Sequence, residues 1–257
     1  RHIFRSSRET TGTLLNFGKY TTFTLIGTNL LRSADTLIIS LSPLGPAAVA
    51  LYSIPLKLTE LQMIPLRSFT ATAFPRMSRA SILGKTEELR SVFYSYTGAL
   101  TYLFIFISIA SFLLADFLVL VLGGAQYAGI DPVTGVNTAT IVRIFAIYGL
   151  LLPLDRMTGV GLDSINKPDK NLIKVLFMVL ANVTGDLIAV YVFTSLPAVA
   201  IASVLFTLIG VFIGFYFFNR ELRISHRNIF ISGLEFYRLS YLRVRSNLNP
   251  LFPKLKK

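Results

Sequence analysis

Six long stretches of mostly apolar residues follow one another along this chain, separated by turn residues. A helix needs about 20 such residues to cross the hydrocarbon layer of a bilayer. Stretches such as 100–114 and 199–218 are nearly apolar on every face, which is typical of helices in lipid rather than of alternating barrel strands. The sequence therefore predicts an all-α integral membrane protein with a bundle of six transmembrane helices. The predicted spans are 20–41, 47–74, 92–114, 138–162, 172–194 and 198–219.

The lysines and arginines between the spans and at their ends predict the orientation of the chain. Twenty of the 25 lie at the start, in the second-to-third connection, in the fourth-to-fifth region or in the tail, and the other three connections have none. Because cytoplasmic connections carry the basic residues, both ends of the chain are expected in the cytoplasm. We expect residues 1–19 to be a cytoplasmic linker between lobes, residues 20–219 to be the transmembrane lobe, and residues 220–257 to be a basic cytoplasmic tail.

Two further helices are predicted outside the spans. Residues 118–122 are apolar but too few to cross a membrane, so we expect a short helix at the outer surface. In the tail, apolar residues recur at helical spacing among arginines, which favours an amphipathic helix in the membrane interface over a solvated, disordered tail. The apolar positions are Phe230, Leu234, Tyr237, Tyr241 and Val244.

Composition excludes several classes of site. The chain has no cysteine, and its two histidines, His2 and His226, lie outside every apolar run. Disulfides, thiol catalysis and a buried histidine metal site are therefore not expected. No phosphate-binding loop or spaced acidic pair suggests an enzyme, and we expect no catalytic residue, metal or cofactor. The net charge of +12 follows from membrane topology, so nucleic acid is not an expected partner.

Apart from Lys174, which is counted with the fourth-to-fifth region, nine charged residues lie inside the predicted spans. A charge at the bilayer centre costs about 2.5–3.5 kcal/mol on insertion scales, so such residues usually face a cavity or a partner. The basic ones are Arg32, Lys57, Arg67, Arg143 and Arg156, and the acidic ones are Asp35, Glu60, Asp155 and Asp186.

The first two spans carry their polar residues on one face each. Thr21, Thr24, Thr28, Arg32 and Asp35 form a narrow stripe in the first span, and Ser53, Lys57, Glu60 and Arg67 share a face of the second. This pattern predicts two helices that line a cavity. The alternative is local neutralisation, because Arg32–Asp35 and Lys57–Glu60 have the i,i+3 spacing of helical ion pairs. Arg67 has no acidic residue within one turn, which makes it the strongest binding candidate.

The other intramembrane charges leave two interpretations open. Arg143 lies near the outer boundary, where it either binds substrate or extends to the interface. Asp155 and Arg156 are adjacent and point in different directions, which favours a structural role. Asp186 with Asn182 is a candidate coupling site for a cation or proton, and the alternative is a hydrogen bond between helices.

Several motifs together resemble one transporter family. They are Asp35-Thr-Leu-Ile-Ile39, Leu44-Gly-Pro-Ala-Ala-Val49, Leu51-Tyr-Ser53, Phe74-Pro-Arg-Met-Ser-Arg79, Leu122-Gly-Gly124 with Tyr127, Val142-Arg-Ile144, Asn166-Lys-Pro168, Asn182 to Asp186, and Ala198-Val-Ala-Ile-Ala202. In this order and spacing they are similar to the polysaccharide transport, or O-antigen flippase-type, branch of the multidrug/oligosaccharidyl-lipid/polysaccharide exporter (MOP) superfamily. The resemblance covers residues 15–220.

The resemblance implies the C-terminal lobe of a MATE-like, V-shaped transporter in the inner membrane of a bacterium. Its substrate would be an oligosaccharide on undecaprenyl diphosphate, destined for surface polysaccharide or lipopolysaccharide, and its partners would be the lipid bilayer and an N-terminal lobe upstream of this chain. The resemblance implies that basic residues hold the diphosphate, here Arg67, Arg32 and Lys57. From their positions inside the spans, Glu60, Asp35 and Arg143 are further substrate-binding candidates. A cation-coupled multidrug exporter of the same superfamily and a membrane scaffold without transport activity are the alternatives.

Overall fold

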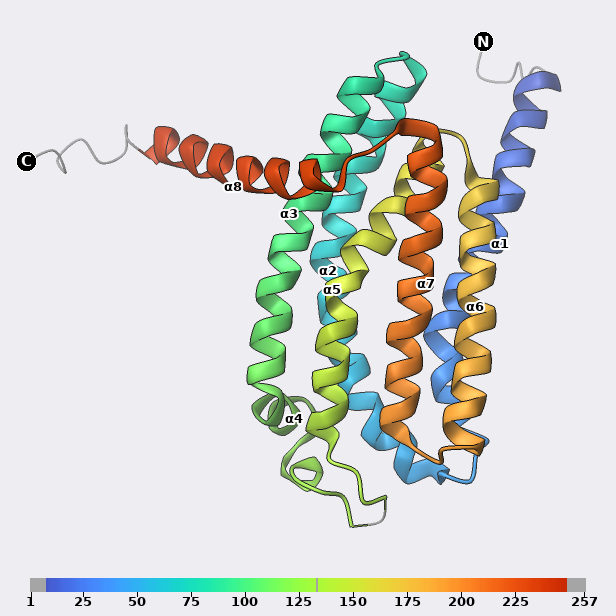
Figure 1. Ribbon diagram of the computed structural model, residues 1–257, viewed down its shortest axis with the longest axis vertical. Helices are drawn as coiled ribbons and strands as arrows, with labels where there is room; N and C mark the ends of the chain where they lie inside the picture. The colour runs from blue at the N-terminus through green and yellow to red at the C-terminus, as the bar shows by residue number, and fades with distance from the viewer. Residues whose placement is uncertain (1–7, 133, 249–257) are drawn as a thin grey trace, which may run out of the picture.

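The computed structural model describes residues 8–132 and 134–248 (Figure 1). Within these residues the chain is helical throughout, and its β-structure is limited to one isolated bridge between Ile130 and Asn137. The elements are α1 (Arg8–Ser40), α2 (Gly45–Ile82), α3 (Thr86–Leu113), α4 (Ala115–Gly123), the 3-10 turn η1 (Ala125–Tyr127), α5 (Thr138–Ser164), α6 (Pro168–Tyr191), α7 (Leu196–Leu222) and α8 (His226–Leu248).

Four of these helices are long and apolar enough to cross a membrane by length and composition. They are α3, α5, α6 and α7. Helices α1 and α2 have 33 and 38 residues, but charged side chains such as Arg32 and Lys57 interrupt their apolar faces. The all-α membrane architecture follows from the four apolar helices, and the count of six spans stays a prediction.

The helices extend past the apolar stretches on which they are centred. Residues 8–19, expected as a linker, form the first turns of α1, and α2 continues to Ile82 instead of ending near position 74. The length of an apolar stretch corresponds to the thickness of the hydrocarbon layer. A helix can be longer than this stretch, because it satisfies its own backbone hydrogen bonds and can continue into water. Residues 1–7 and the tail beyond Leu248 lie outside the described part of the chain.

Five helices form a closed ring. Around this ring α1 packs on α2, α2 on α5, α5 on α7, α7 on α6, and α6 on α1 again. Helix α3 packs outside the ring against α2 and α5, and α4 packs against α5 and α2 at the end of the bundle (Figure 1). The short helix expected at 118–122 is therefore present, as α4.

Small residues allow the helices of the ring to approach closely. A Cβ added to Gly161 would lie 2.7 Å from the Phe218 ring, and one added to Gly185 would lie 2.9 Å from Ala202 Cβ. Lipid tails are as apolar as leucine, so membrane helices associate through tight packing and hydrogen bonds rather than through exclusion of water. This packing holds the ring in the arrangement that positions its inward-facing polar residues.

Candidate functional site

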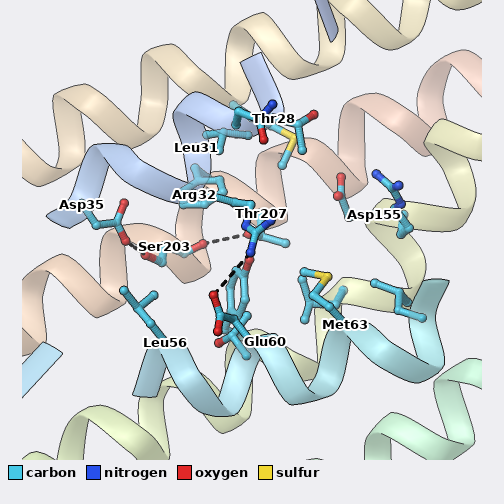
Figure 2. Close-up of a pocket in the computed structure, with 18 of the residues that line it drawn as sticks. Thr28, Leu31, Arg32, Asp35, Leu56, Glu60, Met63, Asp155, Ser203 and Thr207 are labelled. Atoms are coloured by element: carbon cyan, nitrogen blue, oxygen red, sulfur yellow. Dashed lines mark hydrogen bonds and ion pairs between the residues drawn. The ribbon is translucent and has the colours of Figure 1, made fainter. Parts of the chain in front are cut away.

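The ring encloses a cavity of about 300 Å³. Its wall comes from α1, α2, α5, α6 and α7, so residues far apart in the sequence meet there (Figure 2). Four predicted site residues line it, namely Arg32 and Asp35 from α1 and Glu60 and Arg67 from α2. The two helices with polar stripes are thus the helices that contribute these charges.

Arg32 pairs with a residue of the neighbouring helix. Its Nη2 lies 3.4 Å from Glu60 Oε1 on α2, and Figure 2 shows the two side chains pointing toward one another. The two side chains are 50% and 65% exposed, so the pair lies at the open side of the cavity. The local Arg32–Asp35 alternative is wrong, because Glu60 and not Asp35 is the partner of Arg32. An ion pair this exposed contributes about 0–1 kcal/mol, so another ligand can displace it at little cost.

Two arginines line the cavity without a partner. Arg67 from α2 and Arg156 from α5 are exposed side chains in its wall. Within the described residues, neither guanidinium makes an ion pair or a side-chain hydrogen bond. Both therefore keep their donors free for an anion that enters the cavity.

The charge of Asp155, next to Arg156, is neutralised by Lys174, which does not itself line the cavity. Lys174 of α6 lies buried between helices, and its Nζ is 2.8 Å from Asp155 Oδ1 and donates a hydrogen bond of 2.9 Å to the Asp155 carbonyl. Lys174, expected as one of the basic residues of the fourth-to-fifth region, lies inside α6 and belongs to the packed interior. The structural role expected for Asp155 is present, whereas Arg156 faces the cavity.

A second, buried polar cluster adjoins the cavity and is formed by side chains from α1, α2, α6 and α7. Asp35 is its centre: Tyr52 Oη and Ser203 Oγ donate to Asp35 Oδ2 at 2.7 and 3.0 Å, and Asn182 Nδ2 donates to Asp35 Oδ1 at 3.0 Å. The same Asn182 nitrogen donates to Asp186 Oδ2 at 3.1 Å. The hydrogen bond between helices that was one interpretation of Asn182 is therefore present, with Asp35 as its acceptor.

Two oxygens of this cluster have no hydrogen-bond partner. Asn182 Oδ1 and Asp186 Oδ1 are both buried and unpaired. An unpaired buried polar atom costs free energy, and two carboxylates share this enclosed space. The donor set consists of oxygens, which suits a hard cation or a proton and does not suit a soft metal ion. No group of three or more His, Cys, Asp or Glu that could hold a metal ion occurs in the described part of the chain.

The remaining two predicted residues lie elsewhere. Lys57 Nζ donates to the Leu122 carbonyl of α4 at 3.2 Å, and Arg143 Nη2 lies 2.7 Å from Asp116 Oδ2, also on α4. Both cations thus attach the end helix α4 to the ring, and neither lines the cavity described above. The Lys57–Glu60 pair that the spacing allowed is not formed.

Three residues of the site carry little signal in the sequence. Tyr52 and Ser203 resemble ordinary polar residues in apolar spans. The adjacent Asp155 favoured a structural role for Arg156 as well. Only the closure of the ring of α1, α2, α5, α7 and α6 brings these side chains to the cavity and the buried cluster.

Comparison with known proteins gives a family and a fold. A family model described as "Polysaccharide biosynthesis protein" matches residues 1–132. Among solved structures, one titled "Crystal structure of MATE in complex with MaL6" superposes with a TM-score of 0.74 at 17% identity, over 86% of this chain and 48% of that chain. Among curated proteins, none matches the chain in sequence.

Two more MATE structures show the same fold. An "outward-facing conformation of a multidrug resistance MATE family transporter of the MOP superfamily" gives a TM-score of 0.72 at 18% identity, over 86% of this chain and 48% of that chain. A "crystal structure of MATE in the bent conformation" gives 0.69 at 15% identity, over 93% and 56%. The chain thus spans about half the length of the MATE proteins with which it shares its helix arrangement.

Proposed function

This chain belongs to the polysaccharide biosynthesis protein family, and from that premise we propose that it is the C-terminal lobe of a membrane transporter that flips lipid-linked oligosaccharide. In this proposal α1, α2, α3, α5, α6 and α7 all cross the membrane, and both ends of the chain lie in the cytoplasm. The transporter alternates between inward and outward openings, and the open side of the cavity described above faces a wider cleft between this lobe and a lobe upstream.

The observation that carries the proposal is the pair of free arginines in the cavity. Of the charges that line it, Asp155 is neutralised by Lys174, Glu60 is paired with Arg32, and Asp35 belongs to the buried cluster. Arg67 and Arg156 are left over, so the cavity has more free cationic than free anionic groups. The proposed substrate presents the opposite charge, on the diphosphate of an undecaprenyl carrier.

Arginine suits this ligand for a geometric reason. Its planar guanidinium makes two parallel hydrogen bonds to phosphate oxygens, whereas a lysine ammonium acts as a point charge. Arg32 joins as a third donor once the diphosphate displaces Glu60, because the exposed pair between them is weak. The oligosaccharide would then occupy the wider, water-filled space between the lobes.

The buried cluster supports a role in coupling. A cation or proton at Asp35, Asn182 and Asp186 would satisfy the two unpaired oxygens and compensate the carboxylate charge. Loss of that ion would leave α1 less firmly attached to α6, because Asp35 is the α1 residue in this network. An ion gradient would in this way bias the position of α1, whose Arg32 lines the substrate cavity.

A cation-coupled multidrug exporter is the second candidate function. The same buried carboxylates support it, and the shared fold with MATE proteins agrees with it. The two candidates differ at the free arginines, because a cationic drug gains nothing from Arg67 and Arg156. We favour the lipid-linked substrate for that reason.

The test is Arg67→Ala in the full-length transporter, expressed in a strain that lacks its own copy. We expect surface polysaccharide to fall strongly and the lipid-linked precursor to accumulate, while the amount of protein in the membrane stays normal because Arg67 is exposed and unpaired. Arg67→Lys should keep partial function. Arg79→Ala is the matched control, since Arg79 is an exposed arginine of the same helix outside the cavity. Normal export by well-expressed Arg67→Ala would refute the role in binding.

A further inference from the structure

Helix α8 projects sideways from the bundle (Figure 1). It crosses α3 and then projects away from the ring, on the side opposite α1 (Figure 1). Contacts with the lobe run from His226 to Tyr237, and the side chains from Arg238 to Leu242 are exposed, so the function of this exposed part has to be explained.

The crossing with α3 is tight and well defined. Gly98 of α3 and Gly233 of α8 meet backbone to backbone: a Cβ on Gly98 would lie 2.7 Å from Gly233 Cα and would collide with the Ile229 carbonyl oxygen. Beside this contact, Tyr237 Oη donates a hydrogen bond of 2.9 Å to the Ala99 carbonyl. The position of α8 along α3 is therefore fixed by the sequence and is not a loose attachment.

This crossing point corresponds to a shallow depth in the membrane. The uncharged part of α3 begins after Arg90, and its apolar stretch starts at Val92. Gly98 lies six residues further on, which is about 9 Å of helix. Amphipathic helices in the interface bury their apolar face by about 5–10 Å, so α3 holds α8 at the depth that such a helix adopts.

Four of the seven exposed large apolar side chains of α8 lie on one stripe, whereas Ile231, Leu239 and Leu242 lie off it. Phe230, Leu234, Tyr237 and Tyr241 form one stripe, with 45%, 58%, 39% and 66% of their surface exposed. The Phe230 ring lies 6.3 Å from the ring of Tyr102, which is one turn deeper in α3 than Gly98. The stripe therefore points toward the centre of the membrane, away from the cytoplasmic end of α3.

Two arginines border this stripe on the side away from the bundle. Arg227 and Arg238 are exposed, lie three helical turns apart, and point in nearly the same direction. Glu235, also exposed, lies further round the helix. A basic border next to a buried apolar stripe is the arrangement in which side chains reach phosphate groups at the level of the headgroups.

We propose that α8 is a membrane-surface helix whose apolar stripe lies in the bilayer and whose Arg227 and Arg238 bind anionic phospholipid headgroups. This goes beyond the transport proposal and does not depend on the substrate. Through the Gly98–Gly233 crossing, α8 ties α3 and the adjacent α2 to the surface of the membrane, on the edge of the lobe opposite α1. The partner is the phospholipid bilayer and not a second protein.

The chain has no tryptophan, so a single introduced tryptophan reports on one position. We would reconstitute the full chain with Leu234→Trp into vesicles and quench its fluorescence with lipids brominated near the glycerol end of the acyl chain, and separately with iodide in the buffer. We expect strong quenching by the brominated lipid and little by iodide. The matched control is Glu235→Trp, one position along the helix, where iodide should be the stronger quencher. Equal iodide quenching at both positions, or protection of Leu234→Trp from both quenchers as in a protein interface, would overturn the proposal.

The headgroup preference needs a second comparison, in the same Leu234→Trp chain. Brominated phosphatidylglycerol, present as a minority in phosphatidylcholine vesicles, should quench several-fold more per lipid than brominated phosphatidylcholine at low salt. The ratio should fall toward one in the Arg227→Gln/Arg238→Gln variant and at high salt, because screening weakens attraction to the anionic surface. A ratio of one in the parent chain, or an undiminished ratio in the correctly folded double variant, would show that these arginines do not bind anionic headgroups.

Discussion

Asn182 of α6 donates a hydrogen bond to Asp35 of α1 at 3.0 Å, across 147 positions of sequence. The same amide nitrogen holds Asp186 at 3.1 Å, so one side chain joins two buried carboxyl groups. Because α1 and α6 close the ring around the cavity, this contact links the buried cluster to the helix that contributes Arg32. An ion bound in the cluster, as proposed above, would therefore act on the position of α1.

The first prediction concerns that ion. A monovalent cation that binds at Asp35, Asn182 and Asp186 should raise the Tm of the purified chain, relative to choline at equal ionic strength. At a concentration about 100 times its Kd the stabilisation would be about 2.7 kcal/mol. Asp186→Asn should abolish the difference between sodium and choline, measured by thermal unfolding followed with circular dichroism.

Glu235→Gln is the control for this measurement, because it removes an exposed acid of α8 far from the cluster. It should leave the cation effect unchanged. Equal Tm values for the parent chain in sodium, potassium and choline would contradict cation binding. An Asp186→Asn variant with the full cation effect would exclude Asp186 from the site.

The second prediction compares the contributions of Arg32 and Glu60 to substrate binding. Arg32→Ala should weaken binding of a diphosphate lipid by roughly tenfold or more, because a hydrogen bond to a charged group contributes about 1.5–3 kcal/mol. Glu60→Gln should leave binding unchanged or improve it, because it frees Arg32 from its competitor. Neither change should lower stability by more than about 1 kcal/mol. A binding loss of the same size in both variants would indicate that the pair only holds α1 against α2.

The sequence predicts the helices of this lobe better than the contacts between them. Apolar stretches and flanking turn residues predict each long helix and the short helix α4, because these signals are local. The Asn182–Asp186 contact could also be predicted from the sequence, since it joins residues one turn apart on one helix. The partners of Arg32 and Asp35 could not be predicted in this way. These two residues are each other's nearest charged neighbours in the sequence, which suggested a pair that the structure does not form. The true partners depend on the register between α1, α2, α6 and α7, which side-chain packing sets.

The third prediction concerns the buried pair between Lys174 and Asp155. Lys174→Met should destabilise the lobe by about 3–5 kcal/mol, because it leaves the enclosed Asp155 carboxylate without its counter-charge. Lys174→Met combined with Asp155→Leu should recover most of the loss, since it removes both charges together. Denaturant unfolding of the purified chain measures both effects.

The control for this cost is Lys170→Met. Lys170 pairs with Glu221 at the same end of α6, but both side chains retain more contact with solvent. Its removal should cost about 1 kcal/mol or less. If Lys174→Met proved no more destabilising than Lys170→Met, the buried pair would have no structural importance, and Lys174 would be free to act in transport.

The last prediction tests how α8 is held. Gly98→Val places side-chain atoms where the Ile229 carbonyl and the backbone of Gly233 now lie, so α8 has to move away from α3. Neither neighbour is the flexible end of a side chain, and the clash cannot be relieved by a rotamer change. We expect amide hydrogens near the α3–α8 crossing to exchange much faster in this variant, while those of α5 and α7 keep their protection. Gly12→Val is the control, because Gly12 has no neighbouring atom within 4 Å of an added Cβ. Unchanged exchange in α8 of Gly98→Val would mean that lipid alone holds the helix in place, and the glycine crossing would then contribute nothing to its position.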